Sequence, residues 1–311
     1  MQPPTPARRG RLGFALSIVG PAAILALLAY LLASHGHGIA TAASRTSFGQ
    51  LVLVTGLALI TLLARTEAVV SCLAAMGGRP RRRDIHAANS LTFLASTINH
   101  YVSSIVRAAL IRRIDPQRAP TIPQMIMVDA ATSLIEALLV AILIVASASA
   151  LKITWWLAAL VLAAGVGGLA LALAMRRRFG RYQLFRGLDV LAHSRQRSRV
   201  AGLMLIVICC QVLRTLIVLR AVGLHPSLLQ AVATFVAAGV LSSLFAGPGA
   251  GTAGGPLIVF GHRSLAASAA AGLVLSITAL LAGIFYSLLG GPVFLWRLRQ
   301  AIRSPTRRAI T

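Results

Sequence analysis

Long apolar runs alternate along the chain with short stretches rich in arginine. The runs at 12–34 and 153–175 contain no charged residue, and each is long enough to cross a bilayer as a helix, which takes about 20 residues. Four further runs show the same pattern less cleanly. We therefore predict six full membrane-spanning helices, at 12–34, 48–65, 121–149, 153–175, 200–222 and 265–294.

Polar residues, glycine and proline interrupt two more apolar runs, at 87–110 and 227–262. The first contains STINHYVSS, residues 96–104, and the second contains AGPGAGTAGGP, residues 246–256. Glycine inside a helix costs about 1 kcal/mol and proline about 3 kcal/mol relative to alanine. Unwound backbone at membrane depth also needs protein or water to satisfy its polar groups. We predict that each run is a re-entrant hairpin of two half-helices whose break lines a cavity.

The arginine clusters favour re-entry over full crossing for these two runs, because cytoplasmic loops carry an excess of Lys and Arg. With two hairpins, the tail 1–11, the loop 176–199 and the tail 297–311 all face the cytoplasm, whereas eight full crossings put the arginines of 176–199 outside. The two hairpins, each flanked by two spans, then form an inverted repeat of the kind found in transporters.

Composition supports an all-α polytopic membrane protein. The chain is 57% hydrophobic and 12% charged, about half the charged share of a soluble domain. Its net charge of +24 comes from arginine clusters between apolar runs, so we expect membrane lipids and no nucleic acid as partners. A removed signal peptide is the alternative for the first run, but that run exceeds a signal core of 7–15 residues. We treat 1–311 as a single membrane domain.

Soluble cofactor chemistry does not fit the glycine cluster, although GAGTAG (249–254) matches G-x-G-x-x-G. A dinucleotide site needs a preceding strand and an acidic residue about 20 positions later, and no Asp or Glu follows Asp189. His35 and His37 have no acid or cysteine nearby, so we expect neither a cofactor nor a metal site. No catalytic motif is found, and we expect the protein not to be an enzyme.

Three segments carry a family resemblance. They are the basic stretch ARTEAVVSCLAAMGGRPRRRDIHAANS, the hairpin NHYVSSIVRAALIRRI and the hairpin GPGAGTAGG. Together with the order of spans over roughly 45–295, they resemble the membrane region of the lysylphosphatidylglycerol synthase family, which includes stand-alone proteins of hopanoid loci. Asn99, Arg107, Gly249, Gly251 and Thr252 match the hairpin motifs. The resemblance implies a lipid-translocating fold, although Ser104 and Gly254 stand where the family has its signature glutamates.

Two roles fit Arg107. If helices restart near Asn99 and after Pro256, their positive ends together with Arg107 suit a phosphate headgroup. Alternatively, Arg107 extends to the cytoplasmic interface and Asn99 and His100 only cap the broken helix. The predicted substrate-binding residues are Asn99, His100, Arg107, Gly249, Gly251, Thr252 and Gly254.

Asp129 and Glu136 are the only acids expected within a span. Their spacing of seven residues places them on one helical face. Such a pair fits either a proton relay or simple charge pairing with Arg107 or Arg214.

We expect a transporter that moves an anionic or polyprenyl-type lipid across the bacterial inner membrane, with both chain termini in the cytoplasm. The alternative is a membrane scaffold for a lipid-biosynthetic enzyme, whose hairpin breaks would be tightly packed and dry. A membrane-embedded transferase that uses Asp129 or Glu136 with His100 is a third and weaker hypothesis.

Overall fold

Helices make up the part of the chain that the computed structural model describes, which is residues 30, 33–77, 80–96, 100–115, 119–146, 148, 154–179, 182–244 and 248–303. No strand occurs within these ranges. The tail 1–11 and all but three residues of the predicted span 12–34 lie outside them.

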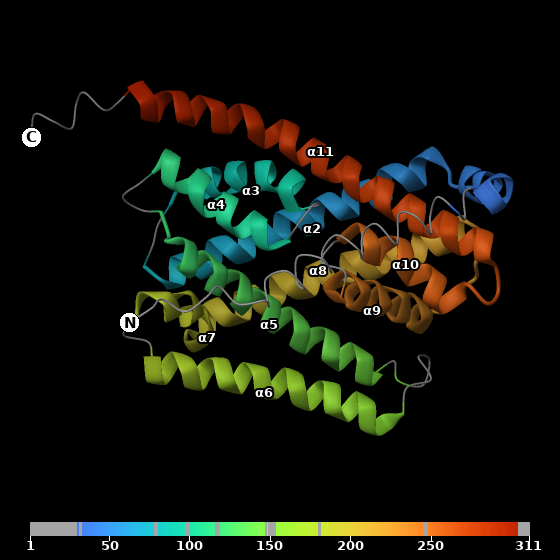
Figure 1. Ribbon diagram of the computed structural model, residues 1–311, viewed down its shortest axis with the longest axis horizontal. Helices are drawn as coiled ribbons and strands as arrows, with labels where there is room; N and C mark the ends of the chain where they lie inside the picture. The colour runs from blue at the N-terminus through green and yellow to red at the C-terminus, as the bar shows by residue number, and fades with distance from the viewer. Residues whose placement is uncertain are drawn as a thin grey trace, which may run out of the picture.

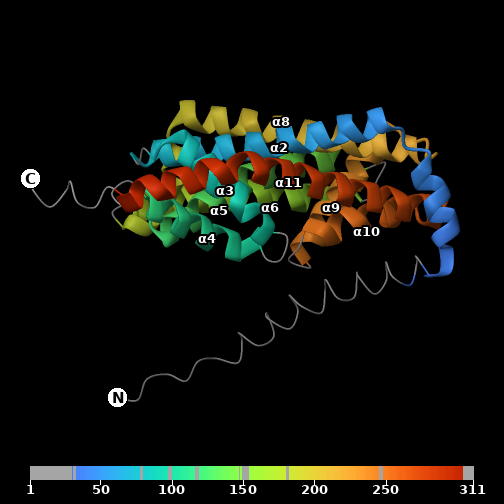
Figure 2. The same cartoon turned by 90° about the horizontal axis from the view of Figure 1, so that it is seen from above.

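Five described helices are long and apolar enough to cross a membrane. They run side by side along the long axis of the molecule (Figures 1 and 2). They are α2 (Phe48–Ala75), α5 (Ile122–Ala146), α6 (Trp155–Phe179), α8 (Ser194–Ala221) and α11 (Leu265–Arg303). Each corresponds to one predicted span. Helices α2, α6 and α11 extend beyond their predicted ends, and α8 begins before its predicted start.

The extension of α2 corrects the predicted boundary at residue 65. The predicted span ended before polar Thr66 and Glu67, but the helix continues to Ala75. Polar side chains at this boundary have partners on neighbouring helices: Arg65 contacts Glu136, and Glu67 contacts His86. Because paired polar side chains are tolerated inside a bundle, they do not end the helix.

Four shorter helices, of 13 to 17 residues, form two pairs. They are α3 (Arg82–Ser96), α4 (His100–Ile114), α9 (Leu228–Leu244) and α10 (Pro248–Phe260). Helix α3 packs on α4 and α9 packs on α10. A helix of 15 residues, such as α3 or α4, is about 22 Å long, less than the roughly 30 Å of a hydrocarbon core. The two pairs lie at opposite ends of the long axis, and their broken ends point toward its middle (Figures 1 and 2).

The second interruption is shorter than the glycines predicted and lies at the start of the stretch 246–256. Helix α9 ends at Leu244 and α10 already begins at Pro248, so the later glycines of the stretch and Pro256 lie inside α10. Proline suits the first turn of a helix, because its missing N–H needs no partner there. The restart after Pro256 is therefore wrong. The first break, between Ser96 and His100, lies where it was predicted.

The basic helix ends gather at one end of the bundle, on the left in Figure 1. There α4 and α6 end, with Arg112 and Arg113 in the last turn of α4 and three arginines in that of α6. The segment 176–199 is mostly helical rather than an open loop. It includes the short helices η1 (Gln183–Leu188) and α7 (Asp189–Ala192), followed by the start of α8.

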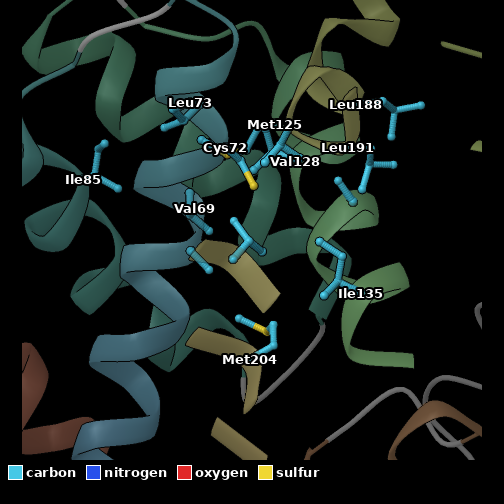
Figure 3. Packing of buried hydrophobic residues seen from close by; sticks show 14 of the residues in the cluster. Val69, Cys72, Leu73, Ile85, Met125, Val128, Ile135, Leu188, Leu191 and Met204 are labelled. Atoms are coloured by element: carbon cyan, nitrogen blue, oxygen red, sulfur yellow. The ribbon is translucent and has the colours of Figure 1, made fainter. Parts of the chain in front are cut away.

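The largest apolar core lies near this basic end and is shown in Figure 3. Val69, Cys72 and Leu73 of α2 meet Met125 and Val128 of α5 in this core. Leu191 of α7 and Met204 of α8 complete the cluster on its other side. This core fixes α5 against α2 and so positions the polar side chains described next.

Candidate functional site

A buried ion pair connects the first hairpin to α5. The Arg107 guanidinium of α4 donates to both carboxylate oxygens of Asp129, at 2.6 and 2.5 Å. A second guanidinium nitrogen donates to the Asn89 side-chain oxygen on α3 at 3.2 Å, and the Ser104 hydroxyl donates to Asp129. The side chains of Arg107 and Asp129 are only 8% and 16% exposed. Arg107 therefore points into the bundle instead of extending to the interface.

Glu136 has a different partner from those predicted. It pairs with Arg65 of α2, and the structure brings it to neither Arg107 nor Arg214. Asp129 and Glu136 share a face of α5 but bind arginines on two different helices. A direct relay between these two carboxylates therefore has no hydrogen-bonded connection in the described part of the chain.

Arg214 is the most deeply buried arginine of the described residues, at 3% exposure. Its guanidinium donates to the backbone oxygen of Leu275 at 3.2 Å, and its Nε has no hydrogen-bond partner there. No carboxylate lies within salt-bridge distance among the described residues. Arg214 is seven residues from the last residue of α8, which places it about 10 Å from the helix end.

A chain of polar contacts that the sequence did not predict leads toward Arg107. Glu67 of α2 contacts the His86 ring at 2.7 Å, and His86 contacts the Tyr286 hydroxyl at 3.0 Å. Tyr286 contacts the Thr66 hydroxyl at 2.9 Å, and Asn89 donates to the same hydroxyl. Two sequence signals were present: adjacent Thr66 and Glu67 in an apolar run, and His86 and Asn89 three residues apart on one helical face.

The second hairpin is held by close packing. A Cβ at Gly251 would lie 1.9 Å from the Ser242 hydroxyl and 2.0 Å from the Ala238 oxygen, and one at Gly254 would lie 2.5 Å from the Leu241 side chain. Glycine is therefore needed at 251 for the approach of α10 to α9, because the Ala238 oxygen is a backbone atom, and small residues act in this way in membrane helices. At Gly254 the close atom is the end of the Leu241 side chain, which can turn.

The structure brings few of the predicted substrate-binding residues together. Thr252 exchanges a hydrogen bond of 3.0 Å with Ser276 of α11. Asn99 lies outside the described residues, as do the side chain of His100 and the surroundings of Gly249. Arg107 is thus the predicted binding residue for which the structure describes a charged partner.

A pocket of about 250 Å³ lies on the basic side, where α4 ends and α5 begins. Arg112 and Arg113 provide its charge, and no described carboxylate pairs with either of them. It is lined by Ala108, Ala109, Arg112, Arg113, Pro120 and Ile122. Within the described ranges, no group of His, Cys, Asp and Glu is arranged to hold a metal ion.

Comparison with protein-family models, with curated proteins and with solved structures finds no match. The family resemblance therefore rests on the sequence motifs alone.

Proposed function

We propose that this protein transports an anionic or polyprenyl-type lipid across the inner membrane of a bacterium. The observation that carries the proposal is the buried Arg107–Asp129 pair, which joins the middle of α4 in the first hairpin to α5. A charged side chain at the centre of a membrane helix costs about 2.5–3.5 kcal/mol, and such residues commonly mark substrate paths. The paired half-length helices are the second support, because transporters hold substrates where interrupted helices meet.

In this proposal a lipid phosphate competes with Asp129 for the Arg107 guanidinium. The pocket at Arg112 and Arg113 lies one turn toward the basic end and offers two cations to a headgroup that enters from the cytoplasmic leaflet. The acyl chains stay in the bilayer. The family motif has a glutamate where Ser104 stands, and the carboxylate that meets Arg107 comes from α5 instead.

Fluorescent-lipid exchange in proteoliposomes tests the proposal. We expect the wild-type protein to accelerate exchange of phosphatidylglycerol or of a polyprenyl phosphate, and Arg107→Ala to slow it at least about tenfold. Arg195→Ala is the matched control, since Arg195 is exposed on α8 and distant in sequence from the site; exchange should stay at the wild-type rate. Unchanged leaflet exchange of every lipid by the wild-type protein contradicts transport.

The alternative proposal is a non-catalytic scaffold for a lipid-modifying enzyme. The tight packing of Gly251 and Gly254 against α9 favours it, because a scaffold needs no opening between hairpin helices. A scaffold predicts no exchange of any lipid together with retention of an enzyme during purification in mild detergent. Neither role assigns a catalytic residue.

A further inference from the structure

Four consecutive polar contacts lead from the Glu67 side chain through α3 and α11 back to the backbone oxygen of Leu62 in α2. They are Glu67–His86 at 2.7 Å, His86–Tyr286 at 3.0 Å, Tyr286–Thr66 at 2.9 Å and Thr66 to the Leu62 oxygen at 2.9 Å. The first side chain is 12% exposed and His86 is 23% exposed, so both lie mostly out of water. Each contact has hydrogen-bond length and needs one proton.

The groups in this row supply too few protons when His86 is neutral. A hydroxyl donates once, a neutral imidazole donates once, and an ionised carboxylate donates nothing. Thr66, Tyr286 and His86 therefore provide three protons for four contacts. Asn89 provides none of the missing ones, because its oxygen accepts from Arg107 and its NH₂ group already donates to Thr66. The row is complete only with one additional proton.

The surroundings of Glu67 place that proton on the imidazole. Arg82 donates to the same carboxylate oxygen as His86, and Arg199 of α8 lies 3.8 Å from the other oxygen. Nearby cations favour the ionised form of a carboxylate. The remaining charged or titratable groups that face this row are Tyr286 of α11 and, through Asn89, the Arg107–Asp129 pair of α4 and α5. With Glu67 ionised, His86 donates from both ring nitrogens.

We propose that Glu67 and His86 form a proton-binding site that controls the hydroxyl groups leading to Asn89 and Arg107. When the proton leaves Nδ1 of His86 for water at the basic end, the Tyr286 O–H turns from Thr66 to Nδ1. The Thr66 O–H then turns from the Leu62 oxygen to Tyr286, and one contact is lost. The same Thr66 oxygen anchors Asn89, which holds Arg107. The site therefore couples proton binding to the ion pair, and this coupling rests on the transport proposed above.

Nitrogen NMR of the imidazole side chains tests the proton site directly in the full-length protein in nanodiscs. The chain has seven histidines, so the His86 signals are identified by their loss in His86→Gln. At pH 7 we expect both ring nitrogens of His86 to carry a proton. A ring nitrogen without a proton at pH 7 overturns the proposal.

Two nearly isosteric variants test the partners. Glu67→Gln removes the counter-charge and Tyr286→Phe removes the acceptor of Nδ1–H, so in each variant we expect one ring nitrogen of His86 to lack a proton at pH 7. His193→Gln, an exposed histidine on the basic side, is the control and should leave both ring nitrogens of His86 protonated. Two protonated ring nitrogens in both folded variants contradict the site.

Lipid exchange measured over pH 5–9 separates the two proposals. If transport is coupled, exchange by the wild-type protein depends on pH, and Tyr286→Phe moves that dependence toward lower pH because the proton on Nδ1 of His86 has lost its acceptor. Lipid exchange that is independent of pH overturns the coupling between proton binding and transport. Whether the proton-binding site exists is then decided by the NMR measurement alone. Absence of exchange in the wild-type protein contradicts the transport proposal alone, because the NMR measurement does not depend on it.

Discussion

Buried acids in this protein are neutralised by arginines from other helices. Asp129 binds Arg107 of α4, Glu136 binds Arg65 of α2, and the fully buried Asp84 binds Arg297 of α11 through two bonds of 2.8 and 2.9 Å. An unpaired charge in hydrocarbon is costly, whereas a pair with good geometry recovers much of that cost. Each pair thus fixes how one helix is rotated against its neighbour.

The Arg107–Asp129 pair should show strong coupling in a double-mutant cycle. Arg107→Leu and Asp129→Leu each leave one buried charge without its partner, and each should lower the free energy of unfolding by about 3–5 kcal/mol. The double variant should recover most of that loss. The measurement is reversible unfolding in detergent micelles, with Arg195→Leu as the exposed control, and additive effects of the two single changes contradict the pair.

Sequence reasoning identified these residues better than their partners. Arg107 was named as one of two possible partners for the intramembrane acids, Asp129 was named as one of those acids, and the two do meet. Glu136 was assigned to the wrong arginines, and Glu67 was placed outside the span. Partner choice depends on how each helix is rotated about its axis. The weak apolar faces of uniformly apolar helices leave that rotation unspecified in the sequence.

The two hairpins are similar elements with different attachments. The α3–α4 hairpin is held by directional bonds, through Asp84, Asn89 and Arg107. In the α9–α10 hairpin, glycines of α10 pack directly on α9. A described polar bond from this hairpin to α11 is the one between Thr252 and Ser276. Directional bonds fix a position to within a fraction of an ångström, and apolar contact fixes it less strictly.

Gly251→Ala should disrupt the second hairpin. Its new methyl group would overlap the Ala238 oxygen, a backbone atom that cannot turn away, and overpacking of this kind costs about 1–3 kcal/mol. The matched control is Gly202→Ala in α8, where a Cβ meets nothing within 4 Å. There the better helix propensity of alanine should leave stability unchanged or raise it by up to about 1 kcal/mol. Thermal unfolding of both variants distinguishes them, and equal melting temperatures contradict the assigned packing role.

Most helices could be predicted from the sequence. The second interruption, between α9 and α10, could not be placed correctly. Five spans and the interruption before His100 followed from apolar length and polar composition. The glycines of α10 suggested unwound backbone, because glycine weakens an isolated helix. Packing reverses this preference where two helix backbones approach closely, and that approach is a tertiary property that α10 alone does not encode.

The whole molecule separates its basic and less basic helix ends. Helices α4 and α6 end, and α8 begins, at the end where the arginines gather, and the loop between α8 and α9 lies at the other (Figure 2). This arrangement agrees with the charge pattern that suggested two hairpins. We propose that the two ends of α8 lie on opposite sides of a membrane.

Cysteine labelling of α8 tests this orientation. In a variant without the native cysteines, Ser198→Cys marks the first turns of α8 and His225→Cys marks the exposed residues after its end. In intact spheroplasts, a membrane-impermeant maleimide should label residue 225 and not residue 198, because the positive end stays in the cytoplasm. Both should react after permeabilisation. Labelling of residue 198 in intact spheroplasts reverses the proposed orientation.

The Asp84–Arg297 pair joins residues 213 positions apart and has a consequence for biogenesis. A ribosome adding about 5–20 residues per second needs roughly 10–40 s to reach the arginine after it has made the aspartate. During that interval the start of α3 has no cation from α11, and the first hairpin cannot adopt its final seating. The first hairpin therefore gains this ion pair only after α11 has been made, and a chain that terminates before α11 leaves the buried carboxylate of Asp84 without its arginine.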